Sequence, residues 1–223
     1  MESLPSLLAL PEGVLAHVLG SLSFEERRRA TPLVCRHLQQ LADSPALNAA
    51  VSVSFGGPLC LPRLRSFCQW LGRHCGSLQQ LRLELDVKDL EVRHRRQASV
   101  TLGWALAGCG FQGSLRQLQL TMRGHEFPCS AWAARLPSLR ALALNCGDDG
   151  AEFVACVVED SLQPLTQLQD LWLGGFYPCF AIDEEAALPL SLTRLHIDGD
   201  EVDTLPLLAR QLSATYPVLP FCS

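Results

Sequence analysis

The most regular hydrophobic pattern along the chain is a six-residue unit, Leu-x-x-Leu-x-Leu or Ile, which occurs five times. The intervals between the first leucines of successive units are 37, 24, 29 and 24 residues. In each unit the last two apolar positions alternate with one other residue, which predicts a short strand with one buried face. Helix-like segments at 98–107, 150–162 and 204–214 lie between or after these strands, so the pattern predicts an α/β fold with parallel strands. The five leucine units begin at Leu78, Leu115, Leu139, Leu168 and Leu192.

Residues 1–50 carry a different pattern, which predicts three short helices. Apolar residues between positions 14 and 22 recur at helical spacing. Ser23 is suited to cap a second helix through Glu26, and Thr31 followed by Pro32 predicts the start of a third. The run Arg27–Arg29 predicts that the second helix is poorly anchored. Three such helices bury too little apolar surface to be stable alone, so we expect a partner or a neighbouring domain to support them.

A connecting segment follows these helices. The apolar residues of 51–55 alternate as in a strand, Gly56 and Gly57 end it, and 64–74 has the pattern of a helix. We therefore divide the chain into a helical module at 1–50, a connection at 51–76 that resembles a degenerate first repeat, and a repeat region of about five units at 77–223. Residues 216–222 look like the start of a further repeat, which either covers the last one or ends a truncated chain.

Composition limits the classes of function. The chain of 223 residues is 48% hydrophobic with a formal net charge of −5, which argues against disorder, nucleic-acid binding and attachment to anionic membranes. Residues 1–100 sum to +3 and residues 101–223 to −8, which suggests two functional surfaces. We interpret the basic cluster Arg93–Arg96 as a solvated loop, with contact to an acidic partner as the alternative. No signal peptide or membrane span is found, so we expect the cytoplasm or the nucleus, with both compartments open.

Candidate chemistry is sparse. The 10 cysteines form no Cys-x-x-Cys pair, and we interpret them as small buried apolar residues, with no metal site and no cofactor expected. Gly108–Gly113 matches Gly-x-Gly-x-x-Gly, but a helix-like run precedes it and a strand follows, which is the reverse of a dinucleotide site. We interpret it as a helix end and a turn. No catalytic signature is present, so we expect no enzyme activity.

The leucine units resemble the leucine-rich repeat. The first half resembles the F-box through Leu10-Pro11, Leu15, Val18-Leu19, Leu22, Val34-Cys35 and Leu41-Ala42. This resemblance implies a three-helix F-box-like module followed by a short solenoid with a curved parallel sheet. It also implies a substrate receptor of a Skp–cullin–F-box ubiquitin ligase that acts in protein degradation, with the Skp adaptor, cullin subunits and an unknown protein substrate as partners. The resemblance implies that the adaptor is bound at or above Leu10, Pro11, Leu15, Val18, Leu19, Leu33 and Val34.

The alternative is a leucine-rich-repeat scaffold with a helical cap and no link to ubiquitin ligases. In both cases we expect a protein to bind the concave sheet face, where alternate strand residues form two columns. Trp172 is the expected anchor of that face, unless its ring folds over Gly174 and Gly175 or is covered by the C-terminal tail. The candidate substrate-binding residues are Arg82, Glu84, Gln119, Thr121, Asn145, Trp172, His196 and Asp198.

Overall fold

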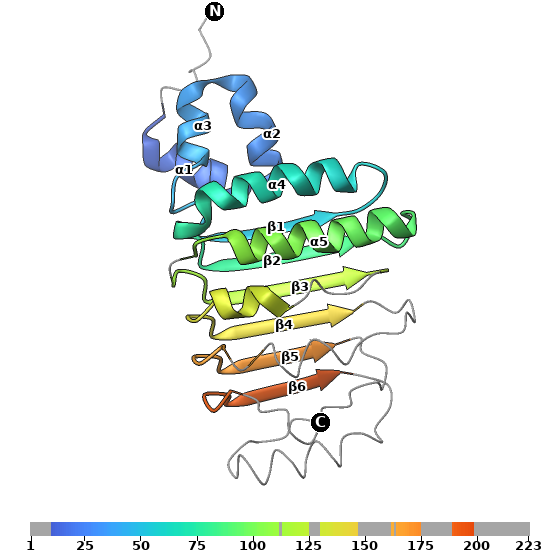
Figure 1. The fold of residues 1–223 in the computed structure, drawn as a ribbon. Coiled ribbons are helices and arrows are strands. Elements are labelled where there is room, and N and C mark those ends of the chain that lie inside the picture. The colour runs from blue at the N-terminus through green and yellow to red at the C-terminus, as the bar shows by residue number, and fades with distance from the viewer. Residues whose placement is uncertain are drawn as a thin grey trace, which may run out of the picture.

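The computed structural model describes residues 10–111, 113–124, 130–146, 162, 164–174 and 189–198. In this part the chain is mixed α/β, with a parallel sheet of six strands and five α-helices (Figure 1). The helices expected at 150–162 and 204–214 fall on residues outside the described part, apart from Leu162.

All six strands are parallel and follow one another in chain order, as the leucine units predict. The second leucines of successive units lie beside one another, so Leu81 pairs with Leu118 and Leu118 with Leu142. Every leucine of the first four units is buried. The strands are β1 (Ala50–Phe55), β2 (Gln80–Asp86), β3 (Gln117–Arg123), β4 (Ala141–Cys146), β5 (Asp170–Gly174) and β6 (Arg194–Asp198).

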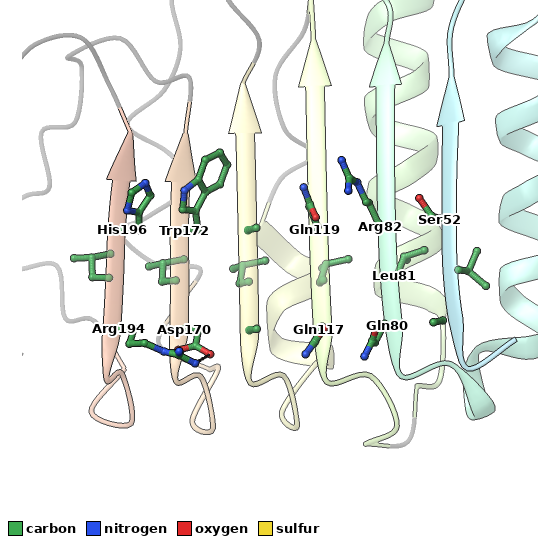
Figure 2. A pocket seen from close by; sticks show the side chains of 18 residues that line it. Ser52, Gln80, Leu81, Arg82, Gln117, Gln119, Asp170, Trp172, Arg194 and His196 are labelled. Atoms are coloured by element: carbon green, nitrogen blue, oxygen red, sulfur yellow. Dashed lines mark hydrogen bonds and ion pairs between the residues drawn. The ribbon is translucent and has the colours of Figure 1, made fainter. Parts of the chain in front are cut away.

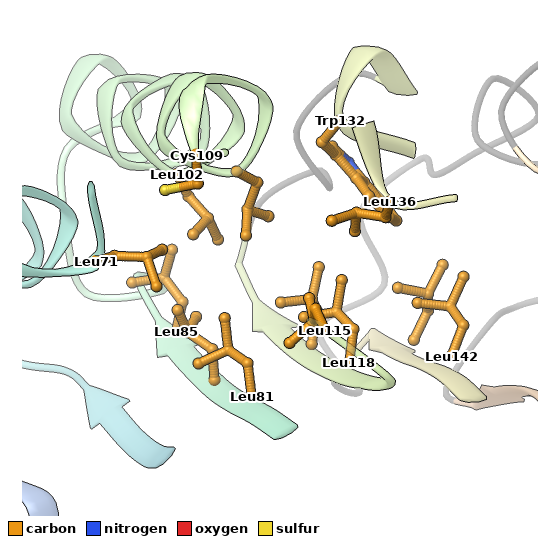
Figure 3. Close-up of a cluster of buried hydrophobic side chains, with 14 of the residues drawn as sticks. Leu71, Leu81, Leu85, Leu102, Cys109, Leu115, Leu118, Trp132, Leu136 and Leu142 are labelled. Atoms are coloured by element: carbon orange, nitrogen blue, oxygen red, sulfur yellow. The ribbon is translucent and has the colours of Figure 1, made fainter. Parts of the chain in front are cut away.

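Helices α4 (Cys60–His74) and α5 (Val92–Gly108) and the 3-10 helix η3 (Ser130–Arg135) cover one face of the sheet (Figure 1). Between them and the strands lies a continuous apolar core, which includes Trp132 and the leucines of the units (Figure 3). A second short 3-10 helix, η2 (Cys75–Ser77), leads from α4 into β2.

The interpretation of Arg93–Arg96 as a loop is wrong, because these residues form the first turns of α5. Arg95 holds this end of the helix in place. Its guanidinium donates hydrogen bonds to the carbonyls of Leu90 (2.7 Å), Gly124 (3.3 Å) and Lys88.

The N-terminal module contains α1 (Glu12–Ser21), α2 (Phe24–Val34) and α3 (Arg36–Ala42). The expected start of the third helix at Thr31 is wrong, since α2 continues through Pro32. The Thr31 hydroxyl donates back to the Arg27 carbonyl at 2.8 Å, so it does not cap a new helix. Instead α3 begins after Cys35, whose sulfur accepts a hydrogen bond from the Leu38 amide at 3.5 Å.

The second helix is firmly attached to the sheet domain, against the expectation drawn from its arginine run. Phe24 is buried in the core of the sheet domain and meets Phe67 and Trp70 edge-on, at centroid distances of 5.9 and 4.5 Å. The Arg28 guanidinium lies 5.8 Å from the centroid of the Phe24 ring and 5.7 Å from that of the Trp70 ring. Arg27 is itself buried. Two of the three arginines therefore pack against protein, Arg27 as a buried side chain and Arg28 with its guanidinium over two rings while the residue stays partly exposed to solvent.

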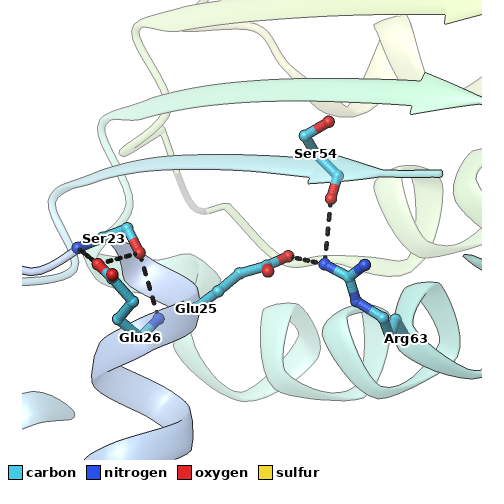
Figure 4. Close-up of polar contacts among 5 residues, drawn as sticks. All are labelled: Ser23, Glu25, Glu26, Ser54 and Arg63. Carbon is cyan, nitrogen blue, oxygen red and sulfur yellow. Dashed lines mark hydrogen bonds and ion pairs between the residues drawn. The ribbon is translucent and has the colours of Figure 1, made fainter.

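Polar contacts stabilise the start of α2 and also join this helix to α4 (Figure 4). Ser23 and Glu26 form the predicted capping box, in which the Glu26 amide donates to the Ser23 hydroxyl (3.2 Å) and the Ser23 amide donates to the Glu26 carboxylate (2.9 Å). The pKa of Glu26 is lowered, because the Ser23 hydroxyl, at 2.7 Å, and the Ser23 amide both donate hydrogen bonds to its charged carboxylate. Farther along, Arg63 on α4 pairs with Glu25 and donates to the carbonyl of Ser54 on β1 at 3.3 Å.

Candidate functional site

The N-terminal module has a small core of its own. Leu15 and Leu19 of α1 pack there against Leu38, Leu41 and Ala42 of α3, and all five are at most 8% exposed. Of the residues proposed to meet the adaptor, Leu15 and Leu19 therefore lie beneath the surface of the module. They stabilise the helix pair, and other residues form the outer surface.

Other aliphatic side chains of the module are exposed, some at α1 and some at the end of α2. On α1, Val14 and Val18 are 45% and 41% exposed, and their spacing of four residues places them on one side of the helix. Leu10, two residues before α1 begins, is 38% exposed. At the end of α2, Leu33 and Val34 are 84% and 58% exposed. Together these five residues are named here the exposed aliphatic residues of the module. Pro11 is exposed beside them.

Val14 was not among the residues that the sequence analysis proposed for binding the adaptor. Its position midway between Leu10 and Val18 at helical spacing was the signal that identifies it. Large aliphatic side chains are usually buried, so a group of them exposed on a small helical module is a candidate surface for binding another protein.

The second candidate surface is the sheet face opposite the helices (Figure 2). It opens into a groove of about 820 Å³ that runs across all six strands. The register confirms the predicted column of side chains, since Arg82 pairs with Gln119, Gln119 with Ala143, Ala143 with Trp172, and Trp172 with His196.

Trp172 both faces the groove and rests on its own strand. Its indole stacks on the His196 ring, with centroids 5.9 Å apart and planes 6° apart. It also lies across Gly174, where a β-carbon would fall 2.1 Å from the indole. The expected alternative, in which the Trp172 ring folds over Gly174, is therefore what the structure shows. The ring remains part of the groove lining, so the fold creates a flat aromatic platform made by Trp172 and His196.

Charges on this face are mostly paired. Glu84 forms an ion pair with Arg123 at 3.3 Å. Asp170 accepts two hydrogen bonds from the guanidinium of Arg194, one of 2.6 Å. Arg82 is exposed, and within the described residues no ion pair or hydrogen bond engages its side chain.

The second column is less accessible than predicted. Thr121 is buried at 9% exposure, so its expected role as an exposed contact is wrong, because Glu84 and Asn145 of the two neighbouring strands lie beside it in register on the same face. Asn145 is half-buried. Asp198 pairs in register with Gly174, and its side chain lies outside the described part.

Among the cysteines whose side chains the structure describes, three are buried, as predicted, and two are half-buried. Cys60, Cys75 and Cys109 are buried, Cys35 and Cys68 are half-buried, and all five are free thiols. Burial raises the pKa of Cys68 to about 11 and that of Cys109 to about 12, which keeps both thiols protonated at neutral pH.

Further predictions concern metal sites, turns and membrane spans. In the ranges that the structure describes, no three His, Cys, Asp or Glu side chains gather as metal ligands would. The expected helix end is found, because α5 ends at Gly108 and Gly113 adopts a φ of +78° in the following turn. Among the described helices, none is both long and apolar enough to cross a bilayer.

One exposed aromatic residue was not singled out from the sequence. Trp104 on the outer side of α5 is 75% exposed, with Val100 one turn before it. The run 98–107 is apolar on nearly all sides, so its pattern does not indicate which side of the helix faces solvent.

Comparison with known proteins adds no relative: no protein-family model matches the chain, and no curated protein matches it significantly.

Proposed function

We propose that the protein is a non-catalytic substrate receptor of a Skp–cullin–F-box ubiquitin ligase. In this proposal the helical module at 1–50 is an F-box that binds the Skp adaptor, and the sheet with its helices is a short leucine-rich-repeat solenoid that binds a protein substrate. Cullin subunits join through the adaptor, and the complex acts in the cytoplasm or the nucleus. The ubiquitin transfer takes place on other subunits.

The single observation that carries this proposal is the set of exposed aliphatic residues on the module. Leu33 and Val34, at 84% and 58% exposure, lie at the end of α2 and do not take part in the core of the module between α1 and α3. Burying an aliphatic side chain against a partner contributes about 1.5–3 kcal/mol each, so several of them together supply a strong driving force for association. A helical cap that only closed the sheet domain would not need them exposed.

The attachment of the module supports the mechanism. Phe24, Arg28 and Glu25 join α2 to α4, so adaptor and sheet face would be held at a fixed separation. A receptor works by proximity, because tethering the substrate raises its effective concentration beside the transfer enzyme. A rigid joint preserves this geometry better than a flexible linker.

The proposal is tested by co-expressing the full chain with the Skp adaptor and comparing recovery of the adaptor for wild type, Leu33→Ser and Val18→Ser. Truncating an interface anchor costs about 2 kcal/mol or more, so each substitution should reduce affinity by roughly 30-fold. The matched control is Leu59→Ser, which alters a leucine that is 65% exposed in the loop before α4. Equal recovery of adaptor by all four proteins, or none by wild type, would favour the scaffold alternative.

A further inference from the structure

On the open sheet face, we infer that the substrate segment is an extended acidic peptide that crosses the strands. An Asp or Glu of the peptide pairs with Arg82, and an apolar residue four positions away packs on the platform of Trp172 and His196. This inference rests on the proposed function, because it takes the sheet face as the substrate-binding surface.

The charge expected of the peptide follows from which charged side chains in the groove already have an ion-pair partner. Among the described residues that line it, Asp170 neutralises Arg194, and the nearby Glu84 is engaged by Arg123. Arg82 is left as an exposed cation in the lining without a described partner. An acidic side chain placed above it would form a charge-assisted pair, and a basic one would be repelled. A single guanidinium matches one carboxylate, whereas phosphate sites are built from clusters of arginines.

The apolar end follows from the platform. The stacked rings of Trp172 and His196 present flat apolar surface, and Ala143 on the neighbouring strand pairs with Trp172 in register. The short alanine side chain leaves that flank of the indole open to a ligand. A leucine or an aromatic residue is the side chain that such a surface binds best, because both bury large apolar area.

The spacing follows from the sheet itself. Arg82 lies on β2 and Trp172 on β5, three strand steps apart, and strands are separated by about 4.8 Å, so the two sites lie about 14 Å apart. An extended chain advances about 3.3 Å per residue, and its side chains return to the same face every second residue. Residues four positions apart therefore span about 13 Å and face the same way. The side-chain amide of Gln119, which is in register with Arg82, has no described hydrogen bond and lies along this path (Figure 2).

Selection of random nine-residue peptides displayed on phage against the full chain tests this inference. We expect enriched sequences with Asp or Glu four positions from Leu, Phe, Tyr or Trp. The variant Arg82→Glu should replace the acidic preference with Lys or Arg at the same spacing, and Trp172→Ala should remove the apolar preference while the acidic one remains. The matched control is Arg65→Glu on the exposed side of α4, which should select the same peptides as wild type.

Affinity measurements complete the test. Synthetic selected peptides should lose about tenfold or more in affinity when the acidic residue becomes Lys, and a phosphoserine at that position should not bind better than Glu. The inference is overturned if no spacing is enriched, if Arg82→Glu selects the same peptides as wild type, or if only phosphopeptides bind. Adaptor co-purification is measured in parallel. Loss of adaptor binding with the peptide preference intact contradicts the ligase proposal alone, and the reverse result contradicts this inference alone.

Discussion

Phe24 is the side chain through which the N-terminal module enters the core of the sheet domain, and Phe24→Ala tests this attachment. The ring is 7% exposed and contacts Phe67 and Trp70 at centroid distances of 5.9 and 4.5 Å, with Arg28 over its face. Phe→Ala substitutions at buried sites cost about 3–5 kcal/mol. The lost edge-on contacts place the expected cost in the upper part of that range.

The assay is urea unfolding of the full chain followed by circular dichroism, with thermal unfolding as a second measurement. For a protein of this size a loss of 3–5 kcal/mol corresponds to a decrease in Tm of about 6–20 °C. The matched control is Trp104→Ala, which removes a large aromatic side chain that is 75% exposed and should change the free energy of unfolding by less than about 0.5 kcal/mol. A loss for Phe24→Ala no larger than that of the control would refute the packing of α2 against α4.

Further predictions concern two glycines, two cysteines and the helix cap at Ser23. Gly124→Ala should destabilise the protein by about 1–3 kcal/mol, because Gly124 has a φ of +81° and a β-carbon there would lie 2.5 Å from backbone, whereas Gly72→Ala on open helix surface should stabilise it by about 0.5–1 kcal/mol. Native Cys68 and Cys109 should resist alkylation at pH 8, since their pKa values are about 11 and about 12. Their folded pKa values exceed those of unfolded thiols, so stability should fall as pH rises above about 9. Ser23→Ala should cost about 1 kcal/mol by removing a helix cap.

Each of these predictions has a clear contrary result. Equal unfolding free energies for Gly124→Ala and Gly72→Ala would contradict the close approach of the two backbone segments. Thiols that react equally fast in native and urea-unfolded protein would contradict their burial, as judged by mass spectrometry of iodoacetamide adducts. An unchanged urea midpoint for Ser23→Ala would show that the capping box does not stabilise α2.

The strands were predictable because their signal is local and repeated. A leucine pair such as Leu81 and Leu83 marks a strand with one buried face, and its recurrence fixes which residues pair between strands. The column from Arg82 to His196 follows directly from this register. The start of α5 was not predictable in the same way, since Arg93–Arg96 lacks apolar periodicity and is held by Arg95 bonding to carbonyls of other segments.

The attachment of the module was hidden from the sequence for a physical reason. Phe24 and Trp70 meet across 46 positions of the chain, and no local pattern links them. The arginine run suggested a solvated helix, although Arg28 uses its flat guanidinium to cover two aromatic rings. The platform of Trp172 over Gly174 was recognisable as an alternative, because a residue without a side chain two positions away leaves room for the indole.

The measurement that tests the central claim most directly is hydrogen–deuterium exchange of the full chain with and without the Skp adaptor. The account predicts that the adaptor slows exchange of backbone amides in α1 to α3, around the exposed residues Val18 and Leu33, and leaves the amides of β2 to β6 unchanged. Exchange in α1 to α3 that is the same with and without adaptor, or protection confined to the sheet, would contradict it.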